Sequence, residues 1–75
     1  MREIKVGSYY RHFKGTTHKV IAIAKHSETL EDMVIYTHEG TDEVWARPYS
    51  LFNSLVDTKK YHQVEQKYRF EEVQL

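Results

Sequence analysis

The stretch HKVIAIA, residues 18–24, gives the clearest strand signal in the sequence. It is rich in β-branched residues, which favour extended backbone. Strict alternation places Val20, Ala22 and Ala24 on one face and Ile21 and Ile23 on the other. Apolar side chains on both faces indicate a strand that is freely solvated on neither side, and the small residues suit the interior of a narrow barrel. The stretch therefore predicts a central strand of a small β-barrel.

Shorter patterns on both sides of this stretch predict the remaining elements. In chain order, these are a strand at Ser8–Phe13, strands at Met33–Thr37 and Val44–Arg47, a short helix from Pro48 through Val56, an extended and mobile connection at Lys59–Lys67, and a closing strand at Tyr68–Glu71. This order predicts a mainly all-β fold, a small SH3-like five-stranded barrel or half-barrel with a short helix before the last strand.

Length and composition limit the classes of protein that fit. Residues 1–75 hold one small domain with a thin core, and the eleven basic residues balance the eleven acidic ones. Zero net charge gives no overall attraction to nucleic acid or to an anionic membrane. The absence of cysteine excludes disulfides and thiol chemistry. The longest apolar run, residues 20–24, is too short to span a bilayer. These features favour a soluble cytoplasmic protein without a membrane partner.

The five histidines do not have the spacing of a metal site. His18, His38 and His62 are interpreted as turn or surface residues, and none of the five forms an H-x-H, H-x-x-x-H or H-E-x-x-H pattern. A site assembled in space from His12, His26 and Glu28 stays as a minor alternative. We therefore expect no metal and no cofactor.

The segment HSET, residues 26–29, follows the apolar strand and has two interpretations. His26 and Glu28 are suited to general acid and base catalysis, with Ser27 or Thr29 as a nucleophile. Short hydroxyl and carboxylate side chains also bond to nearby backbone and hold sharp loops in shape. Residue types alone favour the structural interpretation.

Trp45 and Arg47 lie two residues apart on one predicted strand, so they share a face, and Tyr36 on the neighbouring strand lies beside them. Arginine stacks on rings and binds carboxylate or phosphate through its planar fork. These three residues fit a recognition surface. They fit equally well a set of side chains that only cover the outer face of a thin barrel. In either case Val44 and Ala46 are expected to fill the interior and Trp45 to lie on the surface.

Tyr10, His12 and Lys14 suggest a further binding chemistry, because rings beside cations bind unstacked bases in small barrels. The balanced charge disfavours it, since the phosphate term that supplies most non-specific affinity is then small. Single-stranded nucleic acid stays as a minor alternative.

Three spaced blocks resemble a known family: YRHFKG at residues 10–15, HSETLE at 26–31 and WARP at 45–48. Together with Tyr36 and the pair Arg69-Phe70, they resemble the small bacterial proteins of domain of unknown function 1653, over about Gly7 to Val73. The resemblance implies a shared fold and a shared functional surface that includes the loop of residues 26–31. It implies no established activity.

We therefore expect a non-enzymatic binding module that recognises a peptide, a partner protein or a small anionic ligand. The expected binding residues are Tyr10, His12, His26, Glu28, Tyr36, Trp45 and Arg47. The alternative is a small enzyme or enzyme-accessory domain in which His26 and Glu28 act as acid and base and Arg47 holds an anionic substrate.

Overall fold

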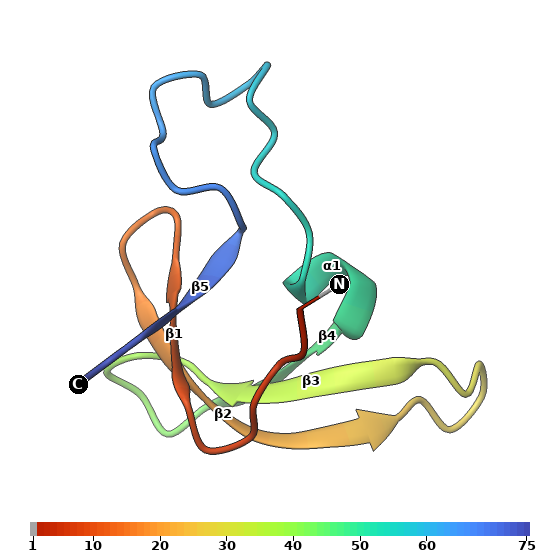
Figure 1. The fold of residues 1–75 in the computed structure, drawn as a ribbon. Helices are drawn as coiled ribbons and strands as arrows, with labels where there is room; N and C mark the ends of the chain where they lie inside the picture. Colours follow the sequence, from red (N-terminus) through yellow and green to blue (C-terminus); the bar gives the residue numbers. More distant parts are fainter. Residues whose placement is uncertain (1) are drawn as a thin grey trace.

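The computed structural model describes residues 2–75, which form one sheet of five antiparallel strands and a short helix (Figure 1). The elements are β1 (Tyr9–His12), β2 (Thr17–Lys25), β3 (Asp32–Thr37), β4 (Val44–Pro48), α1 (Tyr49–Phe52) and β5 (Phe70–Val73). The strand order is β4-β3-β2-β1-β5, so β4 and β5 are edges and the sheet is not closed. The expected plan of five strands with a short helix before the last is confirmed, in its half-barrel form.

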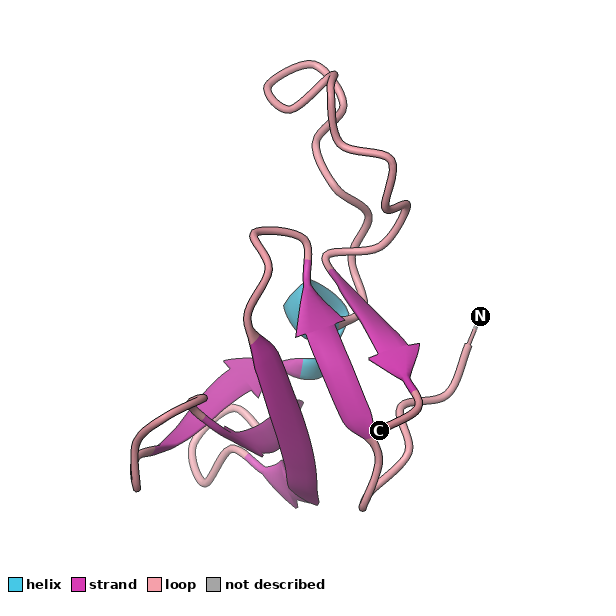
Figure 2. Cartoon of the chain, turned by 90° about the vertical axis from the view of Figure 1, so that its left-hand side faces the viewer, coloured by secondary structure: helices cyan, strands magenta, loops and turns pink. Residues whose placement is uncertain are grey.

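The long strand β2 joins the two parts of the sheet. Its first residues pair with β1, and its residues from Val20 onward pair with β3, with a register shift between Val20 and Ala22. The extra residue of a bulge bends a strand and increases its twist. Accordingly, β1 and β5 stand at a steep angle to β3 and β4, with the helix between the two parts (Figure 2).

The bulge also changes which side chains of β2 face the core. Val20 is fully buried, as the alternation predicts. Ala22 is paired with Ile35 and Ala24 with Met33, so both alanines lie on the outer face, opposite to the buried Val34. The expectation that these alanines fill the interior is wrong, because one inserted residue shifts the alternation. The outer face is also more solvated than expected, since Ile21 is 41% exposed.

The core consists mainly of aromatic rings. Phe52 of α1 stacks on Phe70 of β5 with ring centroids 4.0 Å apart and planes 7° apart. Tyr10 and Tyr36 meet Phe52 at 5.5 and 5.4 Å. The remaining members are Ile4, Val20 and Val34, with Tyr49 packed against the cluster. The core is thin, and four rings supply most of its volume.

Tyr10 and Tyr36, two of the expected binding residues, belong to this core. Each is only 2% exposed, so both rings are almost completely shielded from solvent. Their hydroxyl groups are occupied as well, since Tyr10 accepts a hydrogen bond from the Lys5 N–H (3.0 Å) and Tyr36 accepts one from Arg47 Nε (3.3 Å). A tyrosine can fill a thin core while its hydroxyl reaches a polar partner at the edge, which explains the placement.

Helix α1 is a single turn, shorter than the two turns expected through Val56. Phe52 and Val56 are buried, but Leu55 forms an isolated bridge with Tyr68 and is exposed. The chain leaves the helical conformation because a segment distant in the sequence pairs with Leu55. The spacing of apolar residues does not reveal this pairing.

The segment between α1 and β5 projects from one end of the sheet as a long loop (Figure 1 and Figure 2). Two backbone hydrogen bonds hold its base, Val56 N–H to Lys67 O (2.9 Å) and Arg69 N–H to Ser54 O (2.8 Å). Residues 59–67 contain no strand or helix, but turns at residues 58–60 and 62–63 interrupt the extended connection that was expected there. Within residues 2–75, no helix is long and apolar enough to cross a membrane.

Substitution Phe52→Ala should remove most of the stability of the domain. Truncating a buried phenylalanine costs about 3–5 kcal/mol, against a total of about 5–15 kcal/mol for an ordinary domain. Trp45 lies outside the core cluster and is 42% exposed, so Trp45→Ala should stay folded and unfold at a temperature close to that of the parent. Thermal unfolding followed by circular dichroism measures both. An equal loss in the two variants would show that Trp45 is part of the core.

Candidate functional site

Two adjoining hollows on the concave side of the sheet share His12, Lys14 and Arg47. The first, here called the aromatic groove, has a volume of about 230 Å³ and is lined by His12, Lys14, Thr16, His18, Tyr36, His38, Trp45, Arg47 and Phe70. The second, here called the cationic cleft, has a volume of about 360 Å³ and is lined by His12, Phe13, Lys14, Arg47, Asp57, Lys60, Tyr61 and Arg69.

The register of β4 directs Trp45 and Arg47 toward these hollows. Trp45 is paired with Tyr36 and Arg47 with Val34, both of which are buried, so the two side chains are on the concave face. Val44 and Ala46 therefore lie on the outer face, where Val44 is 56% exposed. The expectation that Val44 and Ala46 fill the interior is wrong. Trp45 is nevertheless at the surface, near the start of the edge strand β4.

The guanidinium of Arg47 is held against the core. Its Nε donates a hydrogen bond to the Tyr36 hydroxyl (3.3 Å), and its central carbon lies 5.3 Å from the centroid of the Phe70 ring. Within residues 2–75, the ion pairs are Lys5–Glu72 and Lys25–Asp32, so no carboxylate lies within 4.0 Å of Arg47. Among the described residues, the charge of Arg47 is therefore directed to the cleft without an anionic partner.

The other cations of the cleft also interact with neutral groups. Arg69 Nε donates to Ser54 Oγ (3.1 Å), and the ammonium groups of Lys14 and Lys60 lie 5.6 and 5.4 Å from the centroid of the Tyr61 ring. The acidic residue in the lining is Asp57, whose Oδ1 accepts hydrogen bonds from the backbone N–H of Lys59 and Lys60. The cleft therefore has an excess of positive charge.

His12 lies on the boundary between the groove and the cleft. Its ring stacks on Phe13 (4.5 Å) and meets the edge of Phe70 (4.9 Å), and its Nδ1 accepts the N–H of Lys14 (3.1 Å). Burial, with the nearby charge of Arg47 as the next cause, lowers the pKa of His12 from 6.5 to about 4. A neutral imidazole with Nδ1 as acceptor carries its proton on Nε2, which leaves Nε2–H as a donor.

His18 lies beneath the groove, although the sequence suggested a turn or surface residue. It is 4% exposed, its Nδ1 bonds to the Thr37 carbonyl (2.7 Å), and its Nε2 bonds to Thr16 Oγ1 (2.8 Å). A carbonyl only accepts, so Nδ1 carries the proton of the neutral ring. Burial is the main cause that lowers the pKa of His18 below its ordinary value.

His26 and Glu28 do not join the other expected residues. Strand β2 is nine residues long, up to about 30 Å, and His12 lies near its start whereas His26 follows its end. Figure 1 shows the turn between β2 and β3 at the opposite end of these strands from the turn between β3 and β4. In that turn His26 Nδ1 accepts the N–H groups of Glu28 (3.1 Å) and Thr29 (3.3 Å). This geometry matches the structural interpretation of the loop.

The structure thus brings together four of the seven expected residues and adds several that sequence reasoning missed. His12, Tyr36, Trp45 and Arg47 meet at the groove, with Tyr36 as its buried floor. The residues missed are Phe13, Thr16, His18, His38, Asp57, Lys60, Tyr61, Arg69 and Phe70. In residues 2–75, no three side chains of the types His, Cys, Asp and Glu are grouped closely enough to hold a metal ion.

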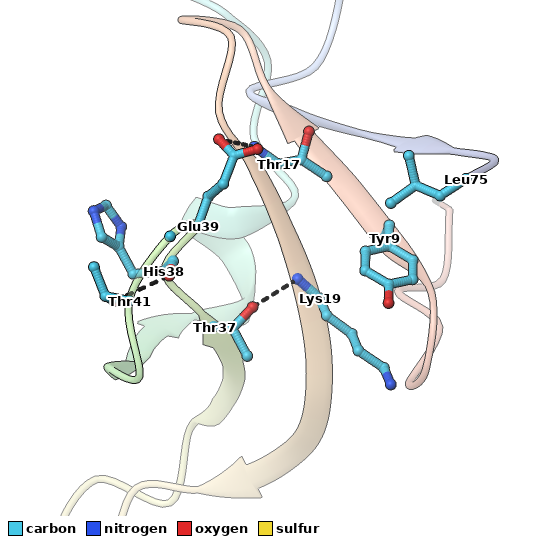
Figure 3. Close-up of a pocket in the computed structure, with 9 residues that line it drawn as sticks. Tyr9, Thr17, Lys19, Thr37, His38, Glu39, Thr41 and Leu75 are labelled. Atoms are coloured by element: carbon cyan, nitrogen blue, oxygen red, sulfur yellow. Dashed lines mark hydrogen bonds between the residues drawn. The ribbon is translucent and has the colours of Figure 1, made fainter.

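A third hollow, of about 450 Å³, lies on the other face of the sheet (Figure 3). Its lining consists of Tyr9, Thr17, Lys19, Thr37, His38, Glu39, Gly40, Thr41 and Leu75. Its polar groups bond to one another, as in Lys19 N–H to Thr37 Oγ1 (3.0 Å) and Thr17 N–H to Glu39 Oε2 (3.2 Å). The His38 ring is turned away from Tyr9 and Lys19 (Figure 3). Without an excess of charge or converging free groups, this hollow is the weaker candidate.

The stability of the domain should fall as the pH decreases from about 6.5 toward 4. The pKa values of His12 and His18 are lowered in the folded state, so below pH 6.5 the unfolded chain binds more protons than the folded chain. The stabilisation is fully present above this window and is lost as the pH approaches about 4, the folded pKa of His12. Thermal unfolding across this range measures the effect. His12→Asn, whose Oδ1 can accept the Lys14 N–H, should reduce the slope, and an unchanged slope would refute the role of His12.

Comparisons with known proteins identify the family. The model of the DUF1653 family, described as a protein of unknown function, matches residues 8–72. A crystal structure of a DUF1653 protein from Bordetella bronchiseptica is similar, with 28% sequence identity, a TM-score of 0.76, and coverage of 97% of this chain and 91% of that one. No curated protein matches the sequence. Since the family model spans most of the chain, this protein belongs to the DUF1653 family.

Proposed function

We propose that this protein is a non-enzymatic binding module whose cationic cleft holds an anionic group, carried by a peptide, a partner protein or a small molecule. The observation that supports this most strongly is a set of cations around one cleft that, within residues 2–75, have no carboxylate within 4.0 Å. The set comprises Arg47, Arg69, Lys14 and Lys60, with the His12 Nε2–H as a neutral donor.

The charge of the cleft is a local property. The chain as a whole has zero net charge, with eleven basic and eleven acidic residues. Four cations and one carboxylate in the same lining therefore create a positive site on an otherwise balanced molecule. Partial burial lowers the effective dielectric constant and strengthens the attraction for an anion. A compact anionic group fits this site better than a long polyanion, which would need a basic stripe.

Arg47 is the best placed of the cations. Arginine presents a planar fork to carboxylate or phosphate, and charge-assisted hydrogen bonds of this kind are about twice as strong as neutral ones. Contacts with Tyr36 and Phe70 already fix its side chain, so ordering it costs little when a ligand binds.

Binding is favoured over the alternative acid–base chemistry by the positions of the groups that catalysis would need. His26 uses its Nδ1 to hold the turn after β2, and neither His26 nor Glu28 is in the lining of the groove or the cleft. His12 is neutral at pH 7 and is surrounded by cations, which makes it a poor proton acceptor but a suitable hydrogen-bond donor.

Titration with inorganic phosphate at constant ionic strength should test the cleft. We expect saturable shifts of the His12 ring signals in NMR spectra, and a rise in the pKa of His12, because a bound anion offsets the surrounding positive charge. Arg47→Gln should weaken phosphate binding about tenfold, which is about 1.4 kcal/mol.

Two further variants make this test independent of the packing of Arg47. Lys14→Gln alters an exposed side chain of the cleft and should also weaken phosphate binding. Lys25→Gln is the matched control, because it removes a cation that is paired with Asp32 outside the cleft. Equal affinity in all variants, or the same response to added chloride, would refute the proposal.

A further inference from the structure

We propose that the ligand of this protein combines its anionic group with a flat apolar ring, and that the ring lies against Trp45 in the aromatic groove. The inference rests on the proposed function, because it takes the cationic cleft as the site of the anion. It adds the chemical class of the rest of the ligand.

The groove and the cleft form one continuous site. They share His12, Lys14 and Arg47, so a molecule held at Arg47 borders both hollows. The two sides differ in chemistry. The cleft is bordered by cations, whereas the far end of the groove is formed by Trp45 and His38, above the buried rings of His18, Tyr36 and Phe70.

The orientation and exposure of the Trp45 side chain suit contact with an apolar partner. Its indole stacks on the His38 imidazole with ring centroids 4.3 Å apart and planes 6° apart, which fixes its orientation. The side chain is nevertheless 42% exposed and lies outside the core cluster. A rigid, partly exposed tryptophan supplies a large contact area at a small cost in conformational entropy, which is why tryptophan is enriched at binding hot spots.

The spacing on β4 sets the dimensions of the ligand. Trp45 and Arg47 are on the same face, two residues apart, and such positions are about 7 Å apart along a strand. In a ligand that contacts both residues, a short linker of about 7 Å therefore separates the ring at Trp45 from the anionic group at Arg47. Inorganic phosphate has no ring, so it can occupy the cleft but makes no such contact in the groove.

Two sources supply this chemistry, and matched pairs of probes separate them. In the first pair, 3-phenylpropionate represents an aromatic carboxylate, and propionate is the same acid without the ring. In the second pair, adenosine 5′-monophosphate represents a nucleotide, and ribose 5-phosphate is the same phosphate without the base. Affinities are measured from the His12 ring signals, and in the parent protein also from fluorescence, since Trp45 is its single tryptophan.

In the parent protein, the ring-bearing member of at least one pair should bind about tenfold more tightly than its partner. This factor is in the lower range of the affinity gained by stacking one ring on an aromatic side chain. In Trp45→Ala this difference should disappear while phosphate affinity stays the same. Arg47→Gln should weaken both members of the pair by a similar factor. Ile21→Ala, on the exposed outer face, is the control and should change neither.

The outcomes separate this inference from the proposed function. A difference in one pair only identifies the source of the ring, and a difference in both supports the shared chemistry. If phosphate binds but neither pair shows a difference, or if the difference persists in a folded Trp45→Ala, the ring is not recognised by Trp45 and this inference is wrong. If neither phosphate nor any probe binds, the proposed function itself is wrong.

Discussion

The stacked rings of Phe52 and Phe70 are the contact on which the rest of the structure depends. The two edge strands of the sheet, β4 and β5, are not hydrogen-bonded to each other, so backbone pairing alone does not fix the curl of the half-barrel. Phe52 follows β4 in the one-turn helix, and Phe70 begins β5. Their contact at 4.0 Å joins the two ends of the sheet through side chains. In a domain of this size, a few large rings replace the many aliphatic contacts of a thicker core.

The packing of this core sets the positions of the side chains in the candidate site. Phe70 meets His12 at 4.9 Å and lies under the guanidinium of Arg47, so one buried ring is both a core residue and the floor of the site. The same packing withdraws His12 from water and lowers its pKa. Residues that bind and residues that stabilise are therefore in direct contact, and a change in the core also changes the position of the cations.

The sequence was sufficient to predict the fold because most strands carry a local signal. The strand expected at Met33–Thr37 is Asp32–Thr37, and the one expected at Val44–Arg47 is Val44–Pro48. The errors arise where local patterns give no information. A single inserted residue in β2 reversed the faces of its alanines, and the pairing of Leu55 with Tyr68 shortened the helix. For the site, Trp45 and Arg47 could be placed together by strand alternation. Lys60 and Arg69 reach the cleft only because a long loop returns to the sheet, which residue spacing does not predict.

The order in which the chain completes its core has a consequence for folding kinetics. The Arg2 guanidinium donates hydrogen bonds to the Asn53 side chain and to the carbonyl of Phe70, a residue 68 positions away. Both the first residues and the last strand are thus needed before the rings are shielded from water. A chain emerging from the ribosome exposes Phe52 and Tyr36 until β5 has been synthesised, and contacts of such long sequence separation form slowly. The rings of the core therefore stay exposed until β5 is available to pair with β1.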